Sequence, residues 1–302
     1  MDNLCSTAAR GAILMILTVA SLPALAQSST APPCKPTVEG TVDTFELASK
    51  VFDNTRTIRV FVPPGYGEVA NRDRKYAVLY MFDGQNLFDA CLAFDHVHEW
   101  QVDETVTRLV REGKIEPLIV VGVDNAREKR AYEYLPWPDI LQDSERSVLG
   151  GNRLPEFLTR EVMPAVAAKY RVASGRESTG IGGSSYGGVA ALYVGLRAPT
   201  IFGKVLAESP VLHVGNGEMV RYTSFLAMAP DKVFFGVGGR EAETPGLNDA
   251  EVKMIHAVEN NLKNAVLSPS DVLVVYDADA IHNEQAWAKR LPQALQFLFP
   301  AK

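Results

Sequence analysis

Residues 178 to 188 read Ser-Thr-Gly-Ile-Gly-Gly-Ser-Ser-Tyr-Gly-Gly. This stretch begins with one apolar segment and leads into a second of different character. The first, Ser178 to Gly183, is short and bounded by turn residues, which predicts a buried strand. The second, Val189 to Leu196, is typical of a helix. A strand that passes through a glycine-rich turn into a helix is the repeating unit of α/β domains with a mostly parallel sheet.

The same alternation extends over the rest of the chain, in which 47% of the residues are hydrophobic and 22% are charged. Between the strands, helical spacing of apolar residues predicts helices, for example from Val102 to Val110 and from Leu154 to Val166. We therefore expect one domain, residues 38 to 302, with a doubly wound sheet. The further buried parallel strands predicted are Tyr76 to Phe82, Leu118 to Val123, Lys204 to Ala207, Lys232 to Val237 and Asp271 to Tyr276.

An antiparallel edge is expected at the start of the domain. Thr57 to Val62 alternates between apolar and polar residues and ends at Pro63-Pro64, which favours an edge strand with one solvated face. We expect it to pair antiparallel with Gly40 to Leu47.

The first residues have the pattern of an export signal. An apolar run from Gly11 to Leu22 precedes Ala24-Leu25-Ala26, a small-x-small cleavage pattern. The run is about a dozen residues long, whereas a membrane span needs about 20, so an anchor is disfavoured. We expect a cleaved signal peptide at residues 1 to 26, a flexible leader at 27 to 37, and a periplasmic or secreted protein.

Two cysteines, Cys34 and Cys91, remain after the signal. Export would permit a disulfide between them, and a pair of unbonded thiols is the alternative.

Charge and histidine spacing exclude other classes of function. The formal net charge of −6 provides no basic field for phosphate backbones, so nucleic acid is not an expected partner. His96 and His98 lack an evident third ligand, and catalytic zinc needs three protein ligands, so no metal is expected.

The turn at residues 183 to 187 carries the candidate nucleophile. Gly183-x-Ser185-x-Gly187, placed between a strand and a helix, is the nucleophile elbow of the α/β-hydrolase fold. The strained turn lifts the serine hydroxyl above the sheet, and the glycines allow close packing. Ser184 is a weaker candidate, because only Gly182 fits its flanking pattern.

A serine nucleophile needs a base and an orienting acid, which follow in the order Ser, acid, His in this fold. His282 lies on a loop after the strand 271 to 276, whereas His256 falls inside an amphipathic helix and is expected to be a surface or packing residue. Glu241, on the loop after the strand 232 to 237, is the first choice for the acid. Asp277 and Asp279 are alternatives.

Backbone amides are expected to hold the oxyanion. One is the amide of Tyr186, which follows the nucleophile, and the second comes from the loop after the strand 76 to 82, where Gln85 is the first choice.

With these segments in view, the chain resembles the esterase family that includes enterochelin, feruloyl and acetyl-xylan esterases, S-formylglutathione hydrolases and mycolyltransferases. The resemblance implies the roles assigned above to Ser185, His282 and Glu241. The Asp-Gly-Gln and Arg-x-x-Glu-x-x-Pro segments are most similar to the enterochelin-esterase branch, although Ile281 stands where that branch commonly has a small residue. The segments that carry the resemblance are Tyr80 to Asp89, Arg130-x-x-Glu133-x-x-Pro136-Trp137, Gly182 to Gly188, Gly238-x-x-Glu241 and His282-Asn-Glu-x-x-Trp287-x-x-Arg290-Leu291.

The sequence therefore predicts a serine esterase that needs no cofactor and acts on a small-molecule ester. Arg130 and Trp137 are candidate substrate-binding residues, because basic and aromatic side chains near the nucleophile would suit an anionic aromatic ester such as a catecholate siderophore. A feruloyl or acetyl esterase, an acyltransferase and an inactive binding module of the same fold are the alternatives.

Overall fold

The computed structural model describes residues 34–139, 149–242 and 245–301. The expected signal peptide lies outside these ranges. None of the helices in the described part of the chain is long and apolar enough to cross a membrane.

An eight-stranded sheet, in the order β1-β2-β4-β3-β5-β6-β7-β8, forms the centre of the domain. The first two strands form an antiparallel hairpin in which Thr41 pairs with Val62, and β2 is antiparallel to β4. All the remaining pairs are parallel. The predicted α/β-hydrolase fold with an antiparallel N-terminal edge is confirmed. The strands are β1 (Thr41–Ser49), β2 (Asn54–Val62), β3 (Ala77–Phe82), β4 (Leu118–Val123), β5 (Thr179–Ser184), β6 (Lys204–Glu208), β7 (Lys232–Gly238) and β8 (Val272–Asp277).

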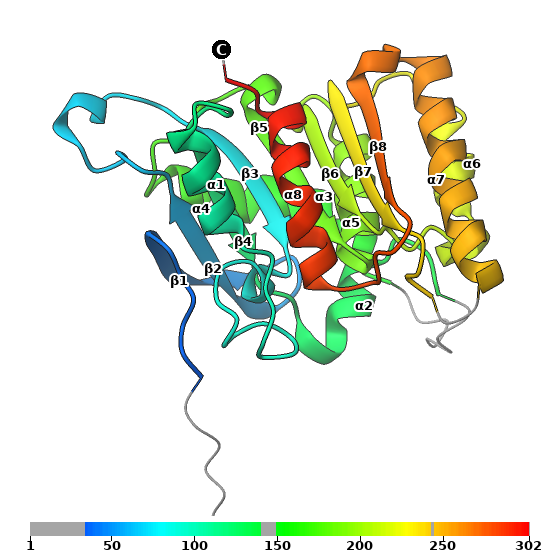
Figure 1. Ribbon diagram of the computed structural model, residues 1–302, viewed down its shortest axis with the longest axis horizontal. Coiled ribbons are helices and arrows are strands. Elements are labelled where there is room, and N and C mark those ends of the chain that lie inside the picture. Colours follow the sequence, from blue (N-terminus) through cyan, green and yellow to red (C-terminus); the bar gives the residue numbers. More distant parts are fainter. Residues whose placement is uncertain (1–33, 140–148, 243–244, 302) are drawn as a thin grey trace, which may run out of the picture. The chain divides into compact units, whose positions relative to one another are not determined.

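Helices cover both faces of the sheet (Figure 1). On one face, α1 and α8 pack over Phe61, Leu79 and Phe234, and on the other α5 packs over Tyr80 and Ile181. The strands alternate between these two cores because successive side chains point to opposite faces. The helices are α1 (Val102–Arg111), α2 (Arg130–Tyr134), α3 (Leu154–Phe157), α4 (Met163–Ala167), α5 (Tyr186–Arg197), α6 (Glu218–Thr223), α7 (Pro245–Ala265) and α8 (Glu284–Leu298), with a π-helical turn at Leu158–Val162 between α3 and α4.

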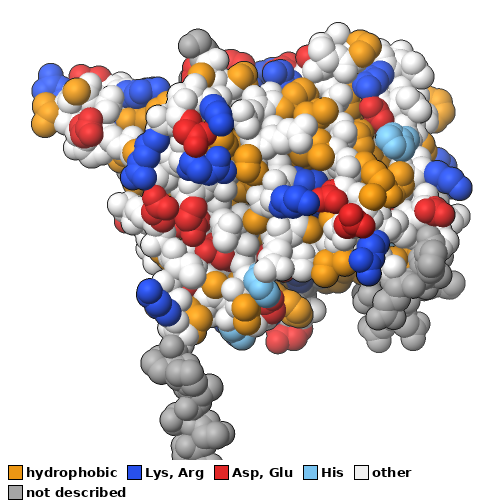
Figure 2. Space-filling model, in the orientation of Figure 1, with side chains coloured by type: hydrophobic (Ala, Val, Ile, Leu, Met, Phe, Trp, Pro, Cys, Tyr) orange, Lys and Arg blue, Asp and Glu red, His pale blue; other side chains and the backbone are white. Residues whose placement is uncertain are grey.

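Acidic and basic side chains are intermixed on the surface that carries α1 and α8 (Figure 2). This agrees with the nearly balanced totals of 30 Lys and Arg against 36 Asp and Glu. Cys34 and Cys91 are both disulfide-bonded.

The parallel strands bring the candidate site residues to one edge of the sheet. The carboxyl ends of β3, β5, β7 and β8 lead into loops that carry Gln85, Ser185, Glu241 and His282 respectively. Ligands bind outside this edge in α/β sheets.

Candidate active site

Ser185 occupies a strained turn between β5 and α5. Its φ and ψ are 56° and −126°, a conformation that non-glycine residues rarely adopt and that costs about 1–3 kcal/mol. The Ser185 amide donates to the carbonyl of Glu208 at 3.0 Å, which ties the turn to the end of β6. A Cβ on Gly183 would lie only 2.5 Å from the Gly187 carbonyl oxygen, so a side chain there would push the turn open. The Gly-x-Ser-x-Gly pattern is therefore what this turn requires.

A cavity of about 390 Å³ opens beside Ser185. It brings together the candidate nucleophile, acid and base from three loops. Ser184 is a buried residue of β5 and does not belong to the lining. The described residues that line the cavity are Asp139, Ser185, Tyr186, Ser209, Pro210, Val211, His213, Glu241, Ala242, Leu247, Asn248, Glu251 and His282.

His282 and Glu241 form a histidine–carboxylate pair at this cavity. Nδ1 of His282 lies 3.3 Å from Oε2 of Glu241, so Nε2 is the ring nitrogen left to face a substrate or nucleophile. The imidazole also packs edge-on against the indole of Trp287, with ring centroids 5.2 Å apart. Asn283 caps α8 by accepting the Ala286 amide at 3.0 Å, which fixes the end of the loop that carries His282.

The Glu241 carboxylate is held by hydrogen bonds from the loop after β6 and from the end of β7. Its Oε1 accepts from the Ser209 hydroxyl and from the Gly238 amide, both at 2.5 Å. Its own amide donates to the Asn248 side chain at 2.9 Å. Arg290 lies 3.7 Å from the same Oε1. A carboxylate with these donors is oriented toward His282 through its second oxygen.

The other candidates from the sequence have different surroundings. His256 is an exposed residue of α7 that pairs with Glu259 at 2.8 Å, so of the two expected roles, surface or packing, it has the surface one. Asp277, the last residue of β8, pairs with Lys289 at 2.7 Å and also accepts the amide of Asp279, which lies in the turn after β8.

A second histidine–carboxylate group lines the same cavity, and the sequence reasoning missed it. Nδ1 of His213 contacts Glu251, and its Nε2 lies 3.5 Å from Oδ1 of Asp139. The pKa of His213 is raised, chiefly by the hydrogen bond to Glu251. Because both ring nitrogens face carboxylates, His213 is less suited than His282 to accept a proton from Ser185. The sequence did contain a feature that could have indicated His213: it follows the predicted strand that forms β6, and so lies at the same sheet edge as the other site residues.

The two candidate oxyanion donors lie on neighbouring loops. The Tyr186 amide is the first of α5, and the first amides of a helix have no partner within that helix. Gln85 lies in the 3-10 turn Gly84–Asn86, after β3. Met81 of β3 pairs with Gly182 of β5, so the two strands lead into adjacent turns.

Arg130 and Trp137 both make contacts within the protein. Arg130 forms a bidentate ion pair with Asp83, with Nε 2.7 Å from Oδ1 and Nη2 2.8 Å from Oδ2. Its guanidinium carbon lies 5.6 Å from the centroid of the Tyr186 ring. Trp137 packs edge-on against Tyr193, with ring centroids 5.6 Å apart. Neither residue is among those that line the cavity.

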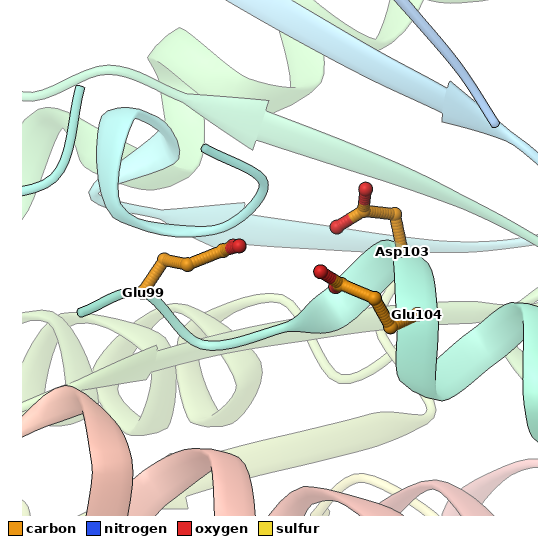
Figure 3. Close-up of side chains that lie close together, drawn as sticks. All are labelled: Glu99, Asp103 and Glu104. Carbon is orange, nitrogen blue, oxygen red and sulfur yellow. The ribbon is translucent and has the colours of Figure 1, made fainter. Parts of the chain in front are cut away.

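Three carboxylates converge at the start of α1, outside that lining (Figure 3). Glu99, Asp103 and Glu104 have ligand atoms within 4.8 Å of one another, and Oδ1 of Asp103 and Oε2 of Glu104 are buried without a hydrogen-bond partner. Burial raises the pKa of Asp103 to about 8 and that of Glu99 to about 7. A shared proton accounts for such close carboxyls, and a divalent cation is the other species that three oxygens could hold. His96 and His98 instead contact the Cys91 carbonyl and Asp95.

Comparison with known proteins gives the same family as the sequence motifs. The model of the Esterase family matches residues 49–298. A Bacillus subtilis (strain 168) protein, the uncharacterized protein YbbA, is 22% identical over 247 residues, which are 81% of this chain and 92% of that protein.

Solved structures of esterases share the fold. A ferulic acid esterase is 23% identical and superposes with a TM-score of 0.64, covering 86% of this chain and 98% of its own. The enterobactin esterase of Shigella flexneri, solved in the presence of enterobactin, is 20% identical with a TM-score of 0.66, covering 88% of this chain and 60% of its own. The chain belongs to the Esterase family of α/β-hydrolases and is a hydrolase that acts on esters.

Proposed function

We propose that this protein is an exported serine esterase that cleaves a carboxylic ester through an acyl-enzyme. The observation that carries the proposal is the convergence of Ser185, His282 and Glu241 on one cavity, with His282 paired to Glu241 through Nδ1. A nucleophile, a base and an orienting acid are the groups that this chemistry needs.

In this mechanism, Nε2 of His282 takes the proton from the Ser185 hydroxyl as its oxygen attacks the ester carbonyl. The oxyanion that forms accepts hydrogen bonds from the Tyr186 and Gln85 amides. His282 then protonates the departing alkoxide, and the acyl group stays on Ser185. Water, deprotonated by His282, releases the acid and restores the serine.

The substrate we propose is an ester whose acyl portion carries an aromatic ring, either a feruloyl ester or an enterochelin-type catecholate ester. Apolar residues, among them Pro210, Val211 and Leu247, line the cavity beside Ser185, and its volume suits an organic group of modest size. The ferulic acid and enterobactin esterases of the same fold support this class. The ion pair of Arg130 with Asp83 offers no support for recognition of a catecholate by Arg130.

A fluorophosphonate probe tests the nucleophile directly. We expect the probe to label the wild-type protein and the Ser184→Ala variant but not Ser185→Ala. Ester hydrolysis by Ser185→Ala should fall at least about a thousandfold. Labelling of Ser185→Ala would overturn the assignment, and an unlabelled wild type with no hydrolysis of any ester would favour the inactive binding module.

Product analysis separates hydrolysis from acyl transfer. Wild-type enzyme given a feruloyl, a catecholate and an acetyl ester should release the free acid, whereas an acyltransferase would yield a new ester when a sugar or lipid alcohol is added. Export is tested by N-terminal sequencing of the protein from the periplasm or medium, which should begin after Ala26.

A further inference from the structure

A second cavity, of about 680 Å³, lies at the edge of the sheet opposite to Ser185. It opens where β3 and β5 begin, since Val78 and Thr179, which pair in the sheet, both line it. The residues proposed for ester hydrolysis follow the carboxyl ends of the strands instead. The second cavity is therefore separate from the proposed active site, and the proposed mechanism uses none of the residues that line it.

The Tyr80 hydroxyl opens into this cavity without a hydrogen bond. Tyr80 lines the cavity although only 1% of its surface is exposed. Its hydroxyl bonds to none of the residues that the structure describes, and its oxygen is not among the fully enclosed polar atoms. The ring is fixed edge-on against Phe202, with ring centroids 6.4 Å apart. A buried polar group with no protein partner is expected to meet water or a ligand.

The same cavity has a positively charged lining. Lys75 and Arg171 line it, and neither forms an ion pair with a carboxylate in the described part of the chain. The Arg171 guanidinium is fixed 3.9 Å from the centroid of the Tyr66 ring and donates to the Tyr66 carbonyl at 2.5 Å. A third cation, Arg176, pairs with Asp231 at 2.7 Å. No Asp or Glu is among the described lining residues, so the charge of Lys75 and Arg171 suits an anion.

Apolar side chains complete the lining, among them Met163, Val172 and Ile201. Lys75 precedes β3 and Tyr80 lies five residues further on, so at about 3.3 Å per residue their Cα atoms are about 16 Å apart. A ligand that meets the cations and the Tyr80 hydroxyl therefore needs polar groups at two ends and an apolar middle. An apolar cavity with a few polar groups is the usual form of a small-molecule site.

We propose that this cavity binds an amphipathic organic acid. The carboxylate of the ligand lies at Lys75 and Arg171, its aromatic or aliphatic body packs on the apolar wall, and a hydroxyl at its far end bonds to Tyr80. The Tyr80 hydroxyl can both donate and accept, so it suits such a group. This inference goes beyond ester hydrolysis and does not depend on it.

Calorimetry with three small molecules tests the proposal: 4-hydroxycinnamate, cinnamate, which lacks the hydroxyl, and 4-hydroxycinnamyl alcohol, which lacks the carboxylate. We expect the wild type to bind 4-hydroxycinnamate about fivefold more tightly than cinnamate, the effect of one neutral hydrogen bond. It should bind the alcohol at least about tenfold more weakly than 4-hydroxycinnamate, because hydrogen bonds to charged groups are stronger. Equal affinities for the three molecules, or no binding of any, would overturn the proposal.

Tyr80→Phe removes only the hydroxyl. It should lower the affinity for 4-hydroxycinnamate to that for cinnamate and leave the affinity for cinnamate unchanged. Tyr76→Phe is the matched control, because the Tyr76 hydroxyl also lacks a partner among the described residues but is enclosed and does not line the cavity. This control should keep the fivefold difference. A difference that persists in Tyr80→Phe contradicts the proposal.

Lys75→Gln tests the charge, and because Lys75 is exposed the variant does not disturb the core. It should weaken the binding of both acids about threefold, the effect of an exposed ion pair, and leave the alcohol unchanged. Lys253→Gln, on an exposed lysine of α7 outside the lining, is the control.

Two further outcomes would sink the proposal. If neither Tyr80→Phe nor Lys75→Gln changes the affinity for 4-hydroxycinnamate, the acid binds elsewhere, for example beside Ser185. If inorganic phosphate binds as tightly as 4-hydroxycinnamate, the apolar wall contributes nothing to recognition. None of these outcomes bears on ester hydrolysis, which the labelling of Ser185 tests separately.

Discussion

The Ser209 hydroxyl donates a 2.5 Å hydrogen bond to Oε1 of Glu241, the oxygen that does not face His282. The same hydroxyl oxygen accepts the indole N–H of Trp287 at 2.9 Å, and Trp287 packs against the His282 ring. Ser209 thus connects the proposed acid, Glu241, to the aromatic side chain that packs against the proposed base, His282.

Ser209→Ala is expected to lower kcat about tenfold with little change in KM. The variant removes one of the donors that orient Glu241 and leaves the Trp287 N–H without its acceptor, but it does not touch the nucleophile. Steady-state kinetics on one ester measures the effect. Ser270→Ala, on an exposed serine, is the control and should match the wild type. An unchanged kcat in Ser209→Ala would show that Gly238 and Arg290 hold the carboxylate without the Ser209 hydroxyl.

Loss of the proposed base should be as damaging as loss of the proposed nucleophile. We expect His282→Ala to reduce kcat about as strongly as Ser185→Ala, and the double variant to be no worse than either, because the two residues act in one step. Glu241→Ala should cost less, since an imidazole that is poorly oriented still acts weakly. A larger loss in Asp279→Ala than in Glu241→Ala would move the acid to the turn after β8.

The positions of the parallel strands along the chain were predictable because each is a short apolar run bounded by turn residues. The predicted strand Leu118 to Val123 coincides with β4, and Lys232 to Val237 falls one residue short of β7. The elbow was predictable because its glycines and serine are contiguous. Ser209, His213 and Asp139 were not, because their roles depend on which loops meet above the sheet, and single residues separated by dozens of positions leave no pattern in one sequence.

The carboxyl cluster at the start of α1 should make stability depend on pH. Burial raises the pKa of Asp103 to about 8, above its unfolded value near 3.8, so folding favours the protonated form. The stability contributed by this carboxyl is fully present below about pH 4 and is lost as the pH rises through 8. Oδ2 of Asp103 accepts the Glu39 amide at 2.5 Å, which an asparagine oxygen can also do.

Asp103→Asn is therefore expected to stabilise the protein at pH 9 by about 1–2 kcal/mol, after allowance for solvent screening, and hardly at all at pH 4.5. Urea unfolding at both pH values measures the difference. EDTA should be present, because a cation held by the three carboxylates would stabilise the ionised wild type instead. A variant less stable than the wild type at pH 9 would contradict this assignment of the cluster.

A buried ion pair lies beneath the proposed acid. Arg290 contacts Oε2 of Glu208 at 3.0 Å through Nε and 2.9 Å through Nη2, and both side chains are almost fully buried. Burial raises the pKa of Glu208 to about 7 even though Arg290 opposes the shift. Oε1 of Glu208 has no hydrogen-bond partner among the described residues, so the ionised form of this carboxylate is stabilised mainly by its ion pair with Arg290.

Arg290→Met should destabilise the fold by about 3–5 kcal/mol at pH 8, because it leaves a buried carboxylate unpaired. The loss should shrink at pH 5, because without Arg290 the folded-state pKa rises further and Glu208 takes up a proton that restores stability as the pH falls. Denaturant unfolding at pH 5 and pH 8 measures both effects. Arg221→Met is the control, since Arg221 forms an exposed pair with Glu218. Adding Glu208→Gln to Arg290→Met should recover much of the loss at pH 8 and remove its pH dependence, and a double variant as unstable as Arg290→Met alone would show that the arginine acts through packing rather than through charge.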